Sequence, residues 1–194
     1  MEYADNACTS KDAENVITVV GTGTWGTTLA VQLARAERSV CWLARTEDEA
    51  VRLRQSGENE RFLPGTEIPS SIRITSDPLE ALEGSDLILL VVPSEAMRRN
   101  IRWIAPGIAA SSTKSADSVL VSATKGLETE AGKTMSTLIR EELPLLAPGH
   151  VLALSGPNLA REIAKGQPAA AVLAGTDTAL TRQRRGAKNT NTPP

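Results

Sequence analysis

The sequence predicts one α/β domain built on a doubly wound, mainly parallel sheet. Strand-like runs recur along the chain, and helical patterns fill most of the gaps, which is the order of repeated strand–helix–strand units. These runs are 16–20, 39–44, 72–75, 86–92, 118–123, 150–154 and 169–174. Residues 87–92 are apolar at every position, as in a strand covered on both faces, so we expect this strand in the middle of the sheet.

The first strand-like run leads directly into a glycine-rich turn. Residues 16–30 read VITVVGTGTWGTTLA, so the glycines stand between a β-branched run and a helix-forming stretch. Gly21 would form the tight turn, and Gly26 would let the helix pack on the strand. Gly23 would let a pyrophosphate approach the free N–H groups of the helix. Without the preceding strand this pattern would indicate only a loop, but in this order it predicts a Rossmann-like dinucleotide-binding turn.

Local signals define two further helices. Asp77 is placed to cap a helix with Pro78 at its first position, and Gly84 would close that short helix. Residues 134–143 carry apolar side chains at helical spacing, which is typical of a packing helix. They are Met135, Leu138, Ile139 and Leu143.

Composition restricts the class of protein. A chain of 194 residues with 41% apolar content and a formal charge of −2 fits a soluble globular domain, without a basic face for nucleic acid. No apolar run is long enough for a membrane span. Cys8 and Cys41 offer neither a disulfide framework nor zinc-ligand spacing, so we expect no metal site and a reducing, cytoplasmic setting.

The two ends differ in composition from the patterned part of the chain. Residues 1–15 are polar and lack the apolar core of a secretion signal, so they are predicted to be a disordered leader. Residues 16–174 form the predicted nucleotide-binding domain. Residues 175–194 are polar and basic without apolar periodicity, and are predicted to be a disordered tail.

Polar and turn-forming residues directly follow several of the apolar runs. Besides the glycine turn these are Pro93 and Ser94, the segment 124–126 and the segment 155–158. Ligands bind beyond the carboxyl ends of the strands in open α/β sheets, so these residues would line one crevice, with Pro93 beside the cofactor. Lys125 is the candidate catalytic residue, because an ammonium group can stabilise the negative charge that grows on a carbonyl oxygen during hydride transfer. A surface lysine in a loop is the alternative reading.

Arg45 stands at the end of the second strand, about 20 residues beyond the glycine turn, where an acidic residue would bind the ribose of NAD. A guanidinium group there can instead accept the 2′-phosphate of NADP. Glu47, Asp48 and Glu49 follow immediately and could pair with Arg45 as an ordinary surface cluster. The sequence therefore leaves NAD and NADP both open.

Two dehydrogenase chemistries are disfavoured. The single histidine, His150, opens a strand instead of following one, so it lies at the wrong edge for a histidine-dependent hydroxy-acid dehydrogenase. The single tyrosine, Tyr3, lies in the leader, so a tyrosine–lysine short-chain reductase is not available.

Five segments together, in this order, resemble the NAD(P)-dependent glycerol-3-phosphate dehydrogenase family. They are 21–27 (GTGTWGT), 59–65 (NERFLPG), 92–94 (VPS), 124–128 (TKGLE) and 154–157 (LSGP). The resemblance covers about residues 16–174 and matches the family's N-terminal cofactor domain. It implies hydride transfer between NAD(P)H and dihydroxyacetone phosphate to give sn-glycerol 3-phosphate, a glycerolipid precursor.

The resemblance also implies roles for particular residues. Thr24 and Trp25 would contact the cofactor at the glycine turn, Arg45 would lie at its adenosine end, and Ala160 would approach the cofactor. Lys125 would lie where the nicotinamide and the substrate meet.

Gly156 and Asn158 would line the substrate side of the crevice. Many relatives carry a hydroxyl residue at the position of Asn158 and Phe at that of Leu159. An asparagine can still donate and accept hydrogen bonds, so this is a mild variation.

Family members continue into a helical domain that carries the general acid–base lysine and the groups that bind the substrate phosphate. From this we expect a truncated chain that retains cofactor binding, with an exposed interdomain face that could support self-association. A non-catalytic NAD(P)-binding module is the alternative. A β-hydroxyacid-type dehydrogenase fits the segments 63–65 and 124–126 less well.

Overall fold

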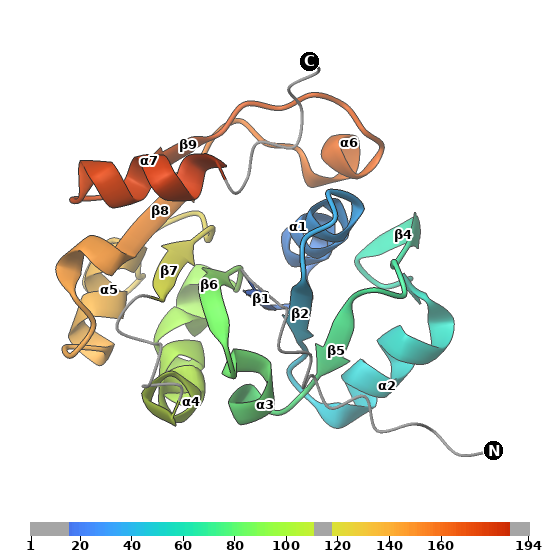
Figure 1. Ribbon diagram of the computed structural model, residues 1–194, viewed down its shortest axis with the longest axis horizontal. Helices are drawn as coiled ribbons and strands as arrows, with labels where there is room; N and C mark the ends of the chain where they lie inside the picture. Colours follow the sequence, from blue (N-terminus) through green and yellow to red (C-terminus); the bar gives the residue numbers. More distant parts are fainter. Residues whose placement is uncertain (1–15, 111–117, 187–194) are drawn as a thin grey trace.

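The computed structural model describes residues 16–110 and 118–186 as a sheet with helices on both faces (Figure 1). The strands lie in the order β5-β2-β1-β6-β7-β8-β9, parallel throughout except that β9 runs antiparallel to β8. Their bounds are β1 Val16–Val20, β2 Val40–Leu43, β5 Arg73–Thr75, β6 Ser85–Leu90, β7 Val119–Ser122, β8 Val151–Ser155 and β9 Val172–Ala174. The predicted doubly wound, mainly parallel sheet is confirmed.

The strand β6 occupies the middle of this order, as its continuous apolar run predicted. Leu87 and Leu89 belong to the core on one face of the sheet, and Ile88 and Leu90 to the core on the other. Successive side chains of a strand point to opposite faces, so the part of the strand that is covered on both faces is apolar at each position.

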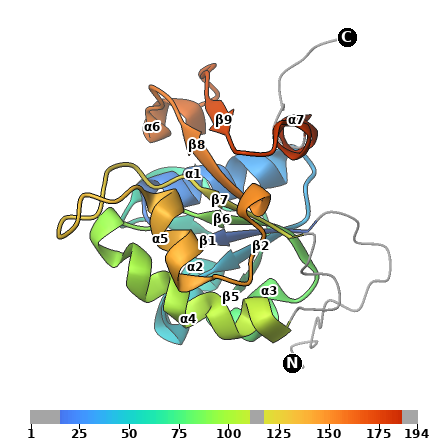
Figure 2. The same ribbon diagram turned by 90° about the vertical axis from the view of Figure 1, so that its left-hand side faces the viewer.

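Helices cover both faces of the sheet. Their bounds are α1 Thr24–Arg35, α2 Glu47–Ser56, α3 Pro78–Leu82, α4 Met97–Ala110, α5 Met135–Glu142, α6 Ala160–Ala164 and α7 Thr178–Gly186. Apolar residues of α1 and α2 join one core, and those of α3, α4 and α5 join the other. Figure 2 shows this layering, with α1 above the strands and α3 and α4 below them. Short 3₁₀ turns cover Ser94–Ala96 and Pro148–His150.

The two predicted helices are confirmed. The Asp77 carboxylate accepts a hydrogen bond from the Leu79 amide at 2.9 Å, with Pro78 at the first helical position of α3. The Thr134 hydroxyl accepts one from the Thr137 amide at 3.3 Å and caps α5. Each side chain satisfies a donor that the first helical turn leaves unpaired.

The structure adds a hairpin that the sequence pattern did not predict. The strands β3 (Glu58–Asn59) and β4 (Leu63–Glu67) pair antiparallel in a separate small sheet. The buried residues of the two strands are Asn59, Leu63 and Thr66, and two of these three are polar. Neither strand therefore shows the alternation of apolar and polar residues that would predict it.

The predicted disorder of the tail is wrong over Thr178–Gly186, which form α7. Asp177 supplies the start of this helix, since its carboxylate accepts a hydrogen bond from the Leu180 amide at 3.0 Å. Leu180 is partly buried against the core that α1 and α2 share. The predicted disordered leader, 1–15, and the last part of the tail, 187–194, lie outside the described residues.

Candidate dinucleotide-binding site

The glycine turn joins β1 to α1 at the carboxyl edge of the sheet. Gly23 is the N-cap residue of α1, in an extended conformation, and has no side chain with which to cap the helix. The first turn of α1 also contains no acidic residue. The helix therefore presents amide donors and the positive end of its dipole to whatever lies beyond the turn, which suits an anion.

The three glycines of the turn serve different purposes. A Cβ atom at Gly21 would lie 2.4 Å from the Val91 carbonyl oxygen, and Gly21 also has a φ of +113°. A Cβ at Gly26 would lie 2.2 Å from the carbonyl oxygen of Gly21. A Cβ at Gly23 would meet no protein atom within 4 Å. The fold thus requires Gly21 and Gly26, whereas the bare backbone at Gly23 leaves open space beside the N-terminus of α1.

Buried hydrogen bonds from the β3–β4 hairpin fix the shape of the turn. The Asn59 side-chain amide donates to the carbonyl oxygen of Thr22 and to the Thr27 hydroxyl, both at 2.8 Å. The Thr27 hydroxyl in turn donates to the Gly23 carbonyl oxygen at 2.9 Å. Asn59 is only 5% exposed, so these bonds are shielded from water. Asn59 thus supports the turn, a part that the sequence pattern did not single out although Asn59 opens the segment 59–65.

We expect Asn59→Ala to lower the free energy of unfolding by about 1–3 kcal/mol, because it leaves buried acceptors of the turn without a donor. Chemical denaturation measures this change. Asn100→Ala is the matched control, since the Asn100 amide donates to the Ala96 carbonyl oxygen, four residues earlier in the 3₁₀ turn before α4, and not to the glycine turn. An equal loss in both variants would contradict a special role for Asn59.

The loops that follow β6, β7 and β8 meet at the same edge, as predicted. The Thr124 hydroxyl donates to the Val92 carbonyl oxygen at 2.8 Å and so holds the loop of Pro93 against that of Lys125. The Lys125 ammonium group donates to the Asn158 carbonyl oxygen at 3.3 Å. The structure thus brings the predicted catalytic lysine to the segment of the predicted substrate residues.

The segment after β8 is closely packed. A Cβ at Gly156 would lie 2.7 Å from the Ala170 carbonyl oxygen, so glycine is required there by the fold. Asn158 is 9% exposed, and its side-chain oxygen is buried without a hydrogen-bond partner in the part of the chain that the structure describes. This oxygen is an acceptor that a ligand hydroxyl could satisfy.

Ala160 begins α6, which packs against α1. The Thr28 hydroxyl of α1 donates to the Ala160 carbonyl oxygen at 3.2 Å. Trp25 lies in the first turn of α1 and lines a cavity of about 190 Å³ together with Asn158. The bond from Thr28 places Ala160 next to α1, the helix that carries Trp25.

Arg45 lies exposed directly after β2. Among the described residues no ion pair involves its guanidinium group, whereas the neighbouring Glu47 pairs with Arg54 at 2.5 Å. The ion pairs of the described residues therefore do not support the alternative in which the acidic residues 47–49 pair with the Arg45 guanidinium group.

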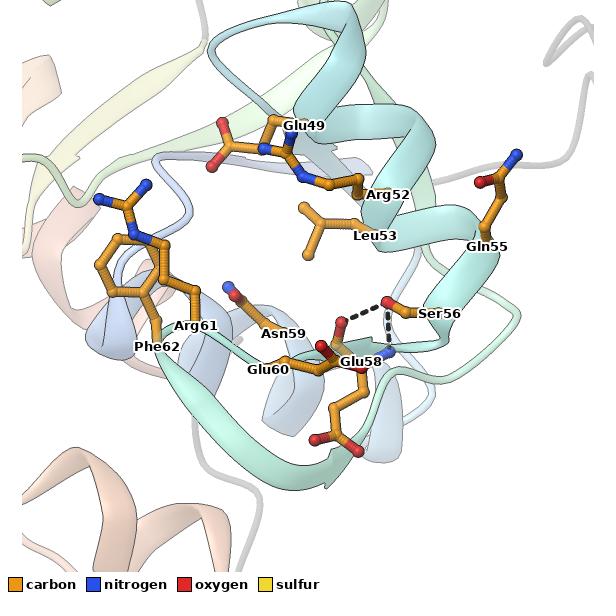
Figure 3. A pocket seen from close by; sticks show the side chains of 10 residues that line it. All are labelled: Glu49, Arg52, Leu53, Gln55, Ser56, Glu58, Asn59, Glu60, Arg61 and Phe62. Atoms are coloured by element: carbon orange, nitrogen blue, oxygen red, sulfur yellow. Dashed lines mark hydrogen bonds between the residues drawn. The ribbon is translucent and has the colours of Figure 1, made fainter.

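A larger cavity, of about 450 Å³, lies between α2 and the β3–β4 hairpin (Figure 3). Glu49 and Arg52 project from the helix on one side, and Arg61 and Phe62 from the hairpin on the other. The Thr24 hydroxyl donates to the Phe62 carbonyl oxygen at 3.0 Å, so this cavity adjoins the glycine turn.

An ionic cluster supports the loop that carries Lys125. The Arg98 guanidinium group on α4 binds Glu128 of this loop and also Glu141 and Glu142 of α5, at 2.7–3.0 Å. Glu142 also accepts two hydrogen bonds from Arg102. The bonds from Arg102 and Arg98 lower the pKa of Glu142 from 4.5 to about 2.

Because the pKa of Glu142 is lowered in the folded state, its ionised form stabilises the fold above pH 4.5. We expect this contribution to be lost as the pH falls from 4.5 toward about 2. Urea denaturation across this range should show a smaller decline for Glu142→Gln than for the wild-type chain. Glu130→Gln, at an exposed position of the same connection, should decline like the wild type. Identical profiles for all three chains would contradict this assignment.

Among the described residues, no group of three or more His, Cys, Asp or Glu side chains is placed to hold a metal ion. None of the helices in the described ranges has the length and apolar character needed to cross a membrane.

The doubly wound sheet, the uncapped helix N-terminus and the open space at Gly23 define a Rossmann-type dinucleotide-binding domain. Residues 16–181 match the family model described as NAD-dependent glycerol-3-phosphate dehydrogenase N-terminus. The chain belongs to this family, as the five sequence motifs predicted.

Curated relatives agree with this assignment. The chain is 43% identical over 162 residues to a protein of Corynebacterium glutamicum named glycerol-3-phosphate dehydrogenase (NAD(P)+). The match covers 83% of this chain and 46% of that protein. The chain thus spans about half the length of the curated relatives it matches.

Solved structures show the same architecture. A glycerol-3-phosphate dehydrogenase from Coxiella burnetii superposes with a TM-score of 0.78 at 29% identity, covering 90% of this chain and 50% of the other. The corresponding protein of Plasmodium falciparum gives a TM-score of 0.74 at 26% identity, with the same coverage of both chains.

Proposed function

We propose that this chain binds NAD(H) or NADP(H) with the pyrophosphate at the N-terminus of α1. The observation that carries the proposal is the contrast among the three glycines, because only Gly23 faces space that no protein atom fills. Thr24, Trp25, Pro93 and Ala160 would contact the cofactor around this point. Arg45 would lie at its adenosine end.

We further propose that the whole protein transfers a hydride between NAD(P)H and dihydroxyacetone phosphate, giving sn-glycerol 3-phosphate. The cofactor supplies the hydride when it is bound. Lys125 would stabilise the negative charge that develops on the carbonyl oxygen of the substrate. Gly156 and Asn158 would line the substrate side, with the unpartnered oxygen of Asn158 accepting a hydrogen bond from a substrate hydroxyl.

Two experiments test these proposals separately. Calorimetric titration of the purified chain with NADH and NADPH should show saturable binding. For the reaction, residues 16–174 would replace the matching half of the Corynebacterium glutamicum relative. That chimera should oxidise NADH only when dihydroxyacetone phosphate is present. A chimera that folds and binds NADH but does not react would favour a non-catalytic nucleotide-binding module.

We also propose a cellular compartment and a mode of self-association for this chain. The small number of cysteines favours a reducing, cytoplasmic setting. Leu127, Leu159 and Val172 are each more than half exposed on the segments that follow β7 and β8 or form β9, which favours self-association through this face. Light scattering over a range of chain concentrations would test this, and a constant monomer mass would contradict it.

A further inference from the structure

The Glu49 carboxylate connects the glycine turn to the end of β2. One of its oxygens accepts a hydrogen bond from the Thr22 hydroxyl at 2.7 Å, and the other accepts from the Arg45 backbone amide at 3.0 Å. Thr46 caps α2 by accepting from the Glu49 amide at 3.3 Å, so the backbone beneath this side chain is also held. Glu49 is only partly exposed, unlike Glu47 and Asp48 beside it.

This position matters because the adenosine ribose of a dinucleotide lies between the glycine turn and the end of the second strand in this fold. An acidic residue at the strand end normally binds the ribose hydroxyls, but here that residue is Arg45. Glu49, in the first turn of α2, places its carboxylate near the end of β2, where that acidic residue would normally lie. A carboxylate has about four acceptor sites, and the two contacts above use one on each oxygen. Acceptor capacity therefore remains for a hydroxyl group.

The neighbouring acidic side chains do not share this position. Glu47 is bound to Arg54 and to the Ser76 hydroxyl, which turns it toward the end of β5. Asp48 is exposed. Figure 3 shows Glu49 at the rim of the cavity between α2 and the hairpin, and its contact with Thr22 places it next to the glycine turn.

We propose that Glu49 determines cofactor specificity by reading the ribose 2′ position. Its carboxylate accepts a hydrogen bond from a 2′-hydroxyl and repels a 2′-phosphate, while the exposed Arg45 guanidinium group attracts that phosphate. The two residues therefore act in opposite directions, and Glu49 shifts the chain toward NADH. This inference rests on the proposed binding of the dinucleotide at the glycine turn.

The test compares the dissociation constants of NADH and NADPH for the chain and its variants by calorimetry at low ionic strength. Glu49→Gln should shift the ratio of the two constants about tenfold toward NADPH, because it removes the charge and keeps the shape. Arg45→Ala should shift the ratio in the opposite direction. Glu47→Gln is the matched control on the same helix and should leave the ratio within about twofold.

Thr22→Val provides a second route to the same residue, since it removes the hydroxyl that holds the carboxylate. It should shift the ratio in the same direction as Glu49→Gln, by a smaller factor, even if Glu49→Gln does not fold. The ratio of the NADH and NADPH dissociation constants could also be equal in the wild type, Glu49→Gln and Thr22→Val. If all three chains still bind NADH, that result would overturn the specificity role of Glu49 and leave the proposed nucleotide binding intact. A wild-type chain that binds neither nucleotide would overturn the proposed function and this inference with it.

Discussion

Gly23→Val is expected to abolish NADH binding while the chain keeps its fold. The new Cβ meets no protein atom within 4 Å, so the side chain enters only the space proposed for the pyrophosphate. Affinity should fall by roughly 100-fold or more, equivalent to at least ~2.7 kcal/mol. Replacing glycine by a β-branched residue at the N-cap costs about 1 kcal/mol, so the melting temperature should fall by only about 2–4 °C.

Gly26→Val is the contrasting variant. Its Cβ would lie 2.2 Å from the Gly21 carbonyl oxygen, so the first turn of α1 must move away from the strand. A cost of at least ~3 kcal/mol is expected, with a melting temperature lower by about 6–12 °C. Thermal unfolding and calorimetry on both variants separate the two effects. Normal NADH binding by Gly23→Val would contradict the placement of the pyrophosphate.

The parts of the fold that the sequence predicted are those with a strong local signal. Residues 87–90 of β6 are all apolar because helices cover both faces of this strand, and β6 lies in the middle of the sheet. The glycine turn was predictable because the β-branched run, the glycines and the helix follow one another within 15 residues. Asp77 marks a helix start through a bond to the amide two residues further on, and the helix at 134–143 was predictable from its apolar spacing.

The parts that could not be predicted depend on contacts between distant segments. Asn59 acts on Thr22 and Thr27, which lie 37 and 32 residues away, and nothing in its own segment indicates a buried position. The β3–β4 hairpin is short and polar, so its sequence shows no apolar–polar alternation from which strands could be predicted. The helix α7 has the Asp177 cap and the partly buried Leu180 at its start, and neither gives the segment an apolar period.

In the candidate site, too, some residues could be predicted from local sequence and others depend on contacts between distant segments. Pro93, Lys125 and Asn158 each follow a strand, and the rule for open sheets places such residues at one edge. The distance of 3.3 Å between the Lys125 ammonium group and the Asn158 carbonyl oxygen bears out their proximity. The position of Glu49 could not be predicted in the same way. On sequence alone it was one of three acidic residues after Arg45, and only its bonds to Thr22 and Arg45 distinguish it.

Lys125→Met is expected to reduce turnover of the chimera by about 100- to 1000-fold, the range found when one preorganised donor to a developing oxyanion is removed. Methionine keeps much of the length of the side chain and removes only its charge and donors. NADH affinity should change little, because the proposed role of Lys125 is at the carbonyl oxygen that is being reduced. Steady-state kinetics with varied dihydroxyacetone phosphate, beside calorimetric NADH binding, separate these quantities.

Lys133→Met is the matched control for this prediction. It lies in the same connection between β7 and α5, but its ammonium group pairs with Glu141 at 2.6 Å, away from the segment of Asn158. It should lower stability slightly and leave turnover within about twofold, because partly exposed ion pairs contribute little. Equal losses of turnover in both variants would contradict a specific role of Lys125, because the loss would not depend on which lysine of this connection is removed. A loss in kcat confined to Lys125→Met, with unchanged NADH affinity, is the result expected for a role at the substrate.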